Sequence, residues 1–257
     1  MRLDDAVALQ SGVTRSQARG LILAGRVRVN GDPITKSGTN VRDGAQIEVE
    51  RAKSYVSRGG EKLEQALTSF GIDPSDKRAL DIGASTGGFT DCLLRFGMAH
   101  VTAVDVGYGQ LAWQLRNDPR VRVVERTNFR YIENETLGEP FDLIVIDVSF
   151  ISLRPIVERA RSHLALGGAI VALVKPQFEA GRERVRRGGV VRDPEVHVAV
   201  LREVRDAMNA LDLRAISVVA SPLLGPAGNR EFFILVKSSG EAISDEAISD
   251  VVGVLES

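Results

Sequence analysis

The stretch that most constrains this chain is 78–90, RALDIGASTGGFT, in which a short apolar run ends in a carboxylate and passes directly into glycines. Phe89, Leu93 and Leu94 then continue with helical apolar spacing. Strand, glycine turn and helix form a crevice for a nucleotide-like ligand in α/β folds, because glycines allow close backbone approach and the helix N-terminus offers unpaired N–H groups. The turn lacks the Gly-x-Gly-x-x-Gly of dinucleotide sites, so an ordinary strand–helix junction remains the alternative.

Length and composition suit a soluble globular protein with one large and one small domain. The chain has 257 residues, of which 44% are hydrophobic and 26% charged. Its one cysteine, Cys92, excludes an intramolecular disulfide, so we expect a reducing, cytoplasmic setting and a buried thiol. The three histidines stand singly without metal-ligand spacing, so no metal site is expected. We find no signal peptide and no apolar run long enough for a bilayer, so no membrane partner is expected.

Charge is distributed unevenly, although the net charge is only −1. Residues 1–60 hold ten Lys/Arg and six Asp/Glu, a balance of +4, and the remainder has a balance of −5. A basic head on a mildly acidic body is compatible with nucleic-acid binding by the head, and a solvated surface is the competing explanation.

Residues 1–50 are predicted to form a small α+β domain, followed by a polar linker over 51–60. A first helix places Leu3, Val7 and Ala8 on one face, and a second helix has Thr14 or Ser16 as its N-cap. A strand then runs into an Asn-Gly hairpin turn, and a strand over 46–49 closes the domain.

Four motifs in this first domain occur in register with one another. They are Arg-Leu-Asp at 2–4, Ser-Gln-Ala-Arg-x-Leu-Ile at 16–22, Gly-x-Val-x-Val-Asn-Gly at 25–31 and Val-x-x-Gly at 41–44. The pattern resembles the S4 RNA-binding domain, and the alternative is a basic solvated helix face. The resemblance implies RNA contacts from this domain and the linker by Arg2, Arg15, Arg19, Arg26, Arg28, Lys36 and Arg58.

The body, 61–240, alternates strands and helices, which is typical of an α/β fold with a mostly parallel sheet. A helix is expected over 61–70, and another over 194–211 with Asp193 as its N-cap. The last two strands are separated only by 221–231, too short for a helical crossover, so they should pair antiparallel. This arrangement resembles the Rossmann-like methyltransferases. The seven predicted strands are 79–82, 101–105, 121–125, 141–147, 169–174, 216–220 and 232–236.

Charged side chains gather at one edge of the predicted sheet. Ligands bind outside the carboxyl ends of parallel strands, where Asp147 and Lys175 stand. Because the last strand is reversed, its N-terminal end, at Glu231, lies on the same edge. Lys62, on the helix before the first strand, can reach it too. An ion-pair cluster without catalytic function is the alternative.

The order Lys62, Asp147, Lys175, Glu231 matches the Lys-Asp-Lys-Glu tetrad of FtsJ-type RNA ribose 2′-O-methyltransferases. The surrounding sequences agree: DLIVIDVSF, KPQFE and GPAGNRE, beside DIGASTGGF in the glycine turn. With the S4 domain in front, the chain resembles the TlyA family, called hemolysin A in older descriptions, over residues 2 to about 237. One departure is in the linker, where some relatives have Arg-x-Trp-Val and this chain has Lys-Ser-Tyr-Val at 53–56.

The resemblance implies S-adenosylmethionine-dependent 2′-O-methylation of a cytidine ribose in 16S rRNA, and in some relatives also in 23S rRNA, with rRNA or ribosomal subunits as partners. Asp81 is expected near the methionine end of the cofactor and Asp105 at its ribose. Asn128 and Phe129 are expected to bound the adenine, with loop packing as the alternative. The predicted cofactor residues are Asp81, Gly83, Ala84, Ser85, Thr86, Gly87, Phe89, Asp105, Val106, Asn128, Phe129 and Asp147.

Ribose methylation requires a more nucleophilic 2′-hydroxyl held in line with the methyl group. An ordinary lysine is protonated at neutral pH, and burial beside a second cation favours its neutral amine. In this interpretation Lys175 is the base, Lys62 the second cation, and Asp147 and Glu231 orient them. The carboxylates oppose the neutral amine, so the sequence leaves open which lysine is the base.

An arginine-rich loop over 181–189 and the residue Arg192 predict a basic rim for phosphate contact, with a solvated charge run as the alternative. Phe150 and Phe178 either stack on an extruded base or belong to the core. The tail, 241–257, is expected to form a short helix. Competing functions are RNA binding without catalysis, small-molecule methylation and hemolysis, and the oligomeric state stays open. The predicted rim residues are Arg182, Arg184, Arg186, Arg187 and Arg192.

Overall fold

The computed structural model divides the chain into two compact units, Met1–Ser54 and Tyr55–Ser257. It describes residues 1–11, 15–23, 25–42, 44–49, 55–181, 183–185 and 188–253. The boundary between the units is earlier than the predicted start of the body at residue 61. Tyr55 is buried in the core of the second unit, and a helix begins at Arg58, so 55–60 belong to that unit rather than to a linker.

The first unit packs two helices on a three-stranded antiparallel sheet of order β2-β1-β3. Its core includes Leu3, Val7 and Ile22. The predicted Asn-Gly turn follows β1, with both residues at positive φ, as a tight hairpin turn requires. Helix α2 begins one residue before Ser16, and Thr14 lies outside the described residues. The elements are α1 Leu3–Ser11, α2 Arg15–Leu23, β1 Val27–Val29, β2 Asp32–Pro33 and β3 Ile47–Val49.

The second unit is an α/β fold around a seven-stranded sheet of order β6-β5-β4-β7-β8-β10-β9. Strands β4 to β8 pair in parallel, whereas β10 pairs antiparallel with both β8 and β9. The predicted fold class, with its single reversed strand, is confirmed. The strands are β4 Arg78–Ile82, β5 His100–Val104, β6 Val121–Val124, β7 Phe141–Ile146, β8 Leu164–Val174, β9 Arg214–Ala220 and β10 Phe232–Lys237.

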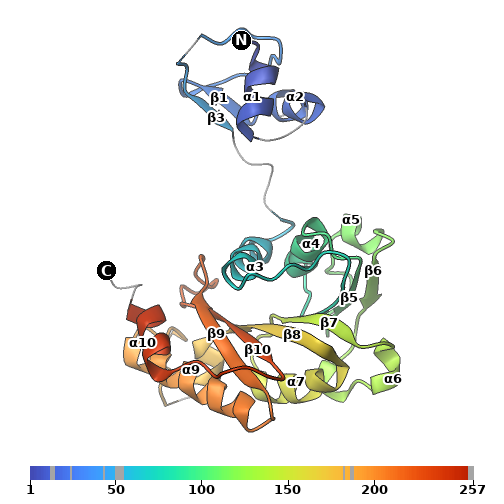
Figure 1. Cartoon of the computed structure of the whole chain (residues 1–257), viewed down its shortest axis with the longest axis vertical. Coiled ribbons are helices and arrows are strands. Elements are labelled where there is room, and N and C mark those ends of the chain that lie inside the picture. The colour runs from blue at the N-terminus through green and yellow to red at the C-terminus, as the bar shows by residue number, and fades with distance from the viewer. Residues whose placement is uncertain are drawn as a thin grey trace. The chain divides into compact units, whose positions relative to one another are not determined.

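Helices cover both faces of this sheet, which explains its nearly continuous apolar strands. Figure 1 shows α3 and α4 on one side and α7 and α9 on the other. Successive side chains alternate between the two cores: Leu143 and Val145 face α3 and α4, while Ile144 and Ile146 face α7 and α9. The helices are α3 Arg58–Ser69, α4 Gly88–Arg95, α5 Trp113–Arg116, η1 Phe129–Tyr131, α6 Asn134–Leu137, α7 Leu153–Ala160, η2 Arg161–His163, α8 Pro176–Glu179, α9 Pro194–Asn209 and α10 Asp245–Gly253.

Two predicted helix features agree with the structure. The Asp193 side chain accepts a hydrogen bond from the Glu195 N–H and so caps α9, which has Pro194 in its first turn. Helix α10 is the short helix expected in the tail, and its buried Ile248 packs into the core that α9 also covers. Cys92 is buried, as predicted.

Candidate functional site

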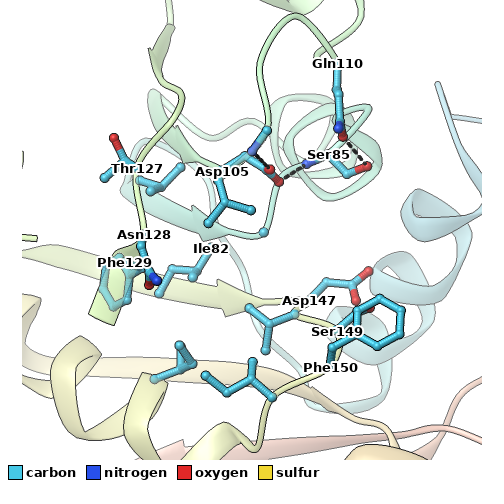
Figure 2. Close-up of a pocket in the computed structure, with 17 residues that line it drawn as sticks. Ile82, Ser85, Asp105, Gln110, Thr127, Asn128, Phe129, Asp147, Ser149 and Phe150 are labelled. Carbon is cyan, nitrogen blue, oxygen red and sulfur yellow. Dashed lines mark hydrogen bonds between the residues drawn. The ribbon is translucent and has the colours of Figure 1, made fainter. Parts of the chain in front are cut away.

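A first cavity of about 540 Å³ opens beyond the carboxyl ends of β4, β5, β6 and β7 (Figure 2). This is the edge at which α/β sheets bind ligands. Residues that the sequence did not single out, including Gly107, Gln110, Thr127 and Ser149, also line it, because turns after the strands carry them there. The predicted cofactor residues that line this cavity are Gly83, Ser85, Asp105, Val106, Asn128, Phe129 and Asp147.

Asp105 follows β5 directly and is held rigidly at the rim of the first cavity. Its Oδ2 accepts a hydrogen bond from the Ser85 N–H at 2.8 Å, and its Oδ1 accepts one from the Gly107 N–H at 2.6 Å, both drawn in Figure 2. Each carboxylate oxygen keeps a further acceptor site for a ligand.

The glycine turn after β4 brings backbone against backbone. A Cβ on Gly83 would lie 2.3 Å from the Asp147 carbonyl oxygen, and the φ of Gly83 is +85°. Gly87 caps α4 at a φ of +96°, and a Cβ there would overlap Leu115. Gly87 is absent from the described lining residues of the cavities, and its contact with the cofactor stays a prediction.

Asp81 directly precedes the glycine turn and is not among the described lining residues of the cavities, and its place near the methionine end of the cofactor stays a prediction. It is fully buried, and its Oδ2 accepts a hydrogen bond from Thr90 Oγ1 at 2.7 Å. Its position in β4 directs the side chain towards α4, because alternate residues of a strand face opposite sides. Burial raises the pKa of this carboxyl to about 7, more than the Thr90 hydrogen bond lowers it.

A second cavity, of about 220 Å³, adjoins the first and shares Gly83, Ser85 and Asp147 with it. Arg58, predicted to contact RNA, lines it and is exposed. The predicted cofactor residues Ala84, Thr86 and Phe89 also line it. All four residues of the predicted tetrad border this one space: Lys62, Asp147, Lys175 and Glu231.

The tetrad forms two ion pairs. Lys62 Nζ lies 2.6 Å from Glu231 Oε2, and the two side chains are 8% and 1% exposed. Lys175 Nζ lies 2.5 Å from Asp147 Oδ1, with 12% and 26% exposure. This second contact is an ion pair without hydrogen-bond alignment, and Lys175 donates its hydrogen bond to Ser149 Oγ at 2.9 Å. The Lys175–Asp147 pair is therefore the more accessible of the two.

Local structure explains how Lys62 and Glu231 meet. The apolar stripe of α3, including Leu63 and Leu67, packs on the sheet, and Lys62 at the edge of that stripe is carried to the cavity. Glu231 immediately precedes the reversed strand β10, so it lies at the same edge as Asp147.

The basic residues of the first unit converge on one carboxylate. Arg2, Arg15 and Arg19 lie 3.0, 3.2 and 3.0 Å from Asp4, whose side chain is fully buried. The Arg2 hydrogen bond, more than those of the other arginines, holds the pKa of Asp4 well below its usual range. The three arginine side chains remain 44–50% exposed, so their outer N–H groups are open to a ligand. The other predicted RNA-binding residues here are Arg26, half-buried, and Arg28 and Lys36, both exposed.

The predicted basic rim is described only in part. Arg192 is exposed, but Arg184 binds both carboxylate oxygens of Glu203, at 2.7 and 2.8 Å, and donates to the Ala180 carbonyl oxygen. These three hydrogen bonds leave two of the five N–H donors of Arg184 for a phosphate. The remaining rim residues, Arg182, Arg186 and Arg187, lie outside the described residues.

Phe150 was open to two interpretations, and the structure shows it outside the core. Its side chain is 90% exposed, its φ is +65°, and its ring centroid lies 4.9 Å from that of Phe178. Figure 2 shows it beside Asp147 and Ser149 at the mouth of the first cavity. A non-glycine residue at positive φ is strained, which is typical of functional positions.

Comparisons with known proteins agree for both units. The S4 domain family matches residues 1–47, and the FtsJ-like methyltransferase family matches residues 55–238. The 16S/23S rRNA (cytidine-2′-O)-methyltransferase TlyA of Mycobacterium tuberculosis is 46% identical over 96% of this chain and 94% of its own length. Hemolysin A of Brachyspira hyodysenteriae is 42% identical over 90% of this chain and 98% of its own length. A solved structure from Streptococcus thermophilus that carries a hemolysin name has 41% identity and a TM-score of 0.77, covering 100% of this chain and 95% of that one.

The sheet with one reversed strand and the cavities at its glycine turn define a Rossmann-like methyltransferase. The chain belongs to the TlyA family, in which an S4 domain precedes an FtsJ-like methyltransferase domain. Although some relatives have hemolysin names, no helix within the described ranges is long and apolar enough to cross a membrane.

Proposed function

We propose that this protein transfers a methyl group from S-adenosylmethionine to the ribose 2′-hydroxyl of a cytidine in ribosomal RNA. The observation that carries the proposal is the convergence of two lysines and two acids on one small cavity that adjoins a cavity of nucleoside size. The M. tuberculosis relative, named for this reaction on 16S and 23S rRNA, supports the choice of substrate.

The first cavity fits the cofactor. About 540 Å³ is within the range of ligand cavities, and its walls are mostly apolar with a few fixed polar groups. The anchored Asp105 carboxylate suits the ribose hydroxyls, and Asn128 and Phe129 would bound the adenine. The glycine turn at Gly83 exposes backbone without a side chain. It would hold the methionine end of the cofactor, next to the second cavity.

The second cavity fits the reacting sugar. Its volume of about 220 Å³ is below the usual range for a complete ligand, so it suits a ribose that enters from an extruded nucleotide. The exposed Phe150 ring, with Phe178 behind it, offers a stacking surface for the displaced base. The S4 domain, with its exposed arginines, would bind another part of the RNA.

Bound S-adenosylmethionine supplies an electrophilic methyl group on a sulfonium. The chain must therefore deprotonate the 2′-hydroxyl and aim it. In this proposal Lys175 accepts the hydroxyl proton while the new O–C bond forms and the methyl–sulfur bond breaks, which leaves S-adenosylhomocysteine, and Asp147 and Ser149 fix the position of the Lys175 Nζ. The buried Lys62–Glu231 pair adds a fixed cation that stabilises the developing alkoxide.

The test is methyl transfer from labelled S-adenosylmethionine to ribosomal subunits, with 2′-O-methyl marks mapped on the rRNA. Lys175→Ala should abolish transfer and leave cofactor affinity unchanged. Lys237→Ala, at the far end of β10, is the matched control and should behave as the wild type. Normal turnover by Lys175→Ala would remove that residue from the mechanism. A wild-type protein that binds subunits without methylating them would be an RNA-binding protein instead.

A further inference from the structure

A third cavity, of about 590 Å³, is as large as the first and has no part in the reaction proposed above. Gln65 of α3 and His197 of α9 line it, together with Val191, Arg192 and the segment 220–230 between β9 and β10. Its size is in the range of cavities that bind complete small ligands.

Hydrogen bonds join the walls of this third cavity. The buried side chain of Asn229 accepts a hydrogen bond from the Val191 N–H and donates one to the Gly189 carbonyl oxygen, both at 2.9 Å. The buried His197 Nε2 lies 3.1 Å from the Val191 carbonyl oxygen. The end of the predicted basic rim, residues 189–192, is thus tied to the segment that carries Glu231, so the cavity keeps a defined shape.

The described lining of the third cavity has two guanidinium groups, Arg192 and Arg230, and no carboxylate. Arg192 is exposed and has neither an ion pair nor a hydrogen bond within the part of the chain that the structure describes. Gln65 and Ser221 add neutral hydrogen-bonding groups. Guanidinium groups beside neutral polar and apolar walls suit a nucleoside phosphate, because the cations bind phosphate oxygens and the walls accept the sugar and base.

Two elements place the third cavity near the tetrad, although it shares no described lining residue with the second cavity. Lys62 and Gln65 are one turn apart on α3, about 4.5 Å along the helix axis. Arg230 immediately precedes Glu231 in the chain, so consecutive residues serve the two cavities. We propose that the third cavity binds the nucleotide next to the methylated one in the RNA strand, with its phosphate at Arg192 and Arg230. This inference rests on the proposed function and adds a second nucleotide subsite to it.

The direct test is a photo-crosslink from Leu224, which is 51% exposed and lines the third cavity. A benzoylphenylalanine placed there in the full chain is irradiated with ribosomal subunits, and crosslinks and 2′-O-methyl marks are mapped in the same sample. We expect crosslinks within about two nucleotides of the methylated one, because neighbouring residues of α3 and of the segment before β10 line the two cavities. Crosslinks only to distant rRNA or to protein, or none while methylation proceeds, would overturn the inference. Absence of the marks with wild-type protein would instead overturn the proposed function.

A kinetic test uses Arg192→Glu. We expect its KM for subunits to rise about tenfold, with kcat and cofactor affinity unchanged, because one charge-assisted contact is replaced by repulsion. Arg214→Glu is the matched control, since Arg214 begins β9 and the cavity lies at the other end of that strand. A KM equal to that of the control, or a loss confined to kcat, would refute binding in this cavity.

Discussion

The buried ion pair of Lys62 and Glu231 allows stability to be separated from catalysis. Glu231→Gln leaves an ammonium group, 8% exposed, without its carboxylate. Breaking such a pair from one side costs about 3–5 kcal/mol of unfolding free energy. A unit of about two hundred residues loses roughly 2–4 °C of melting temperature per kcal/mol. The variant should therefore melt about 6–20 °C below the wild type.

The double variant Lys62→Met/Glu231→Leu removes both charges, and replacing a buried pair by apolar residues is often neutral for stability. We expect it to melt near the wild type and still fail to methylate RNA. Calorimetry and methyl transfer on the same preparations give both readouts. The matched control is Glu203→Gln, which opens the exposed pair with Arg184 and should cost less than about 1 kcal/mol. A Glu231→Gln variant as stable as this control, or a double variant with normal turnover, would refute the reasoning.

Three further perturbations follow from the geometry. Asp105→Ala should weaken cofactor binding at least about tenfold in calorimetry, because it removes the fixed acceptor at the rim; unchanged affinity would contradict that assignment. Asp81→Asn should flatten the pH dependence of stability. Because its pKa is raised to about 7, Asp81 in the folded protein keeps a proton that the unfolded chain releases above pH about 4. The free energy of unfolding therefore falls as pH rises from about 4 to about 7. An equal dependence of this free energy on pH in the variant and the wild type would exclude Asp81 as the cause. Gly83→Ala should abolish cofactor binding, because its Cβ would lie 2.3 Å from the Asp147 carbonyl oxygen, and a variant that binds normally would show that the turn can yield.

Much of the second unit could be predicted because its signals are local. Apolar runs ending in acids mark β4, β5 and β7, and the short segment before β10 leaves no room for a crossover helix. The same reasoning placed Asp147, Lys175 and Glu231 at one edge, and the structure brings their side chains to one cavity.

The positions of several side chains could not be predicted from the sequence, because they depend on contacts between residues distant in the chain or on an unusual backbone conformation. Tyr55 lies in a polar stretch, yet it is buried because Gly60 leaves room for its ring, and the neighbouring Val56 N–H donates to Asp91 at 2.9 Å. A phenylalanine after an apolar strand resembles a core residue, but Phe150 is held outside by an unusual backbone conformation that no pattern encodes. The arginines of the S4 domain were visible as charge, but their shared carboxylate partner was not.

The insertion of β10 between β8 and β9 has a consequence for synthesis on the ribosome. The acid that Lys62 needs is translated 169 residues after it, when the parallel strands β4 to β8 have already been translated. A nascent or truncated chain that ends before Glu231 would therefore contain the glycine turn and both lysines while lacking the partner of the first. Methylation activity should thus appear only in chains long enough to insert this late strand between β8 and β9.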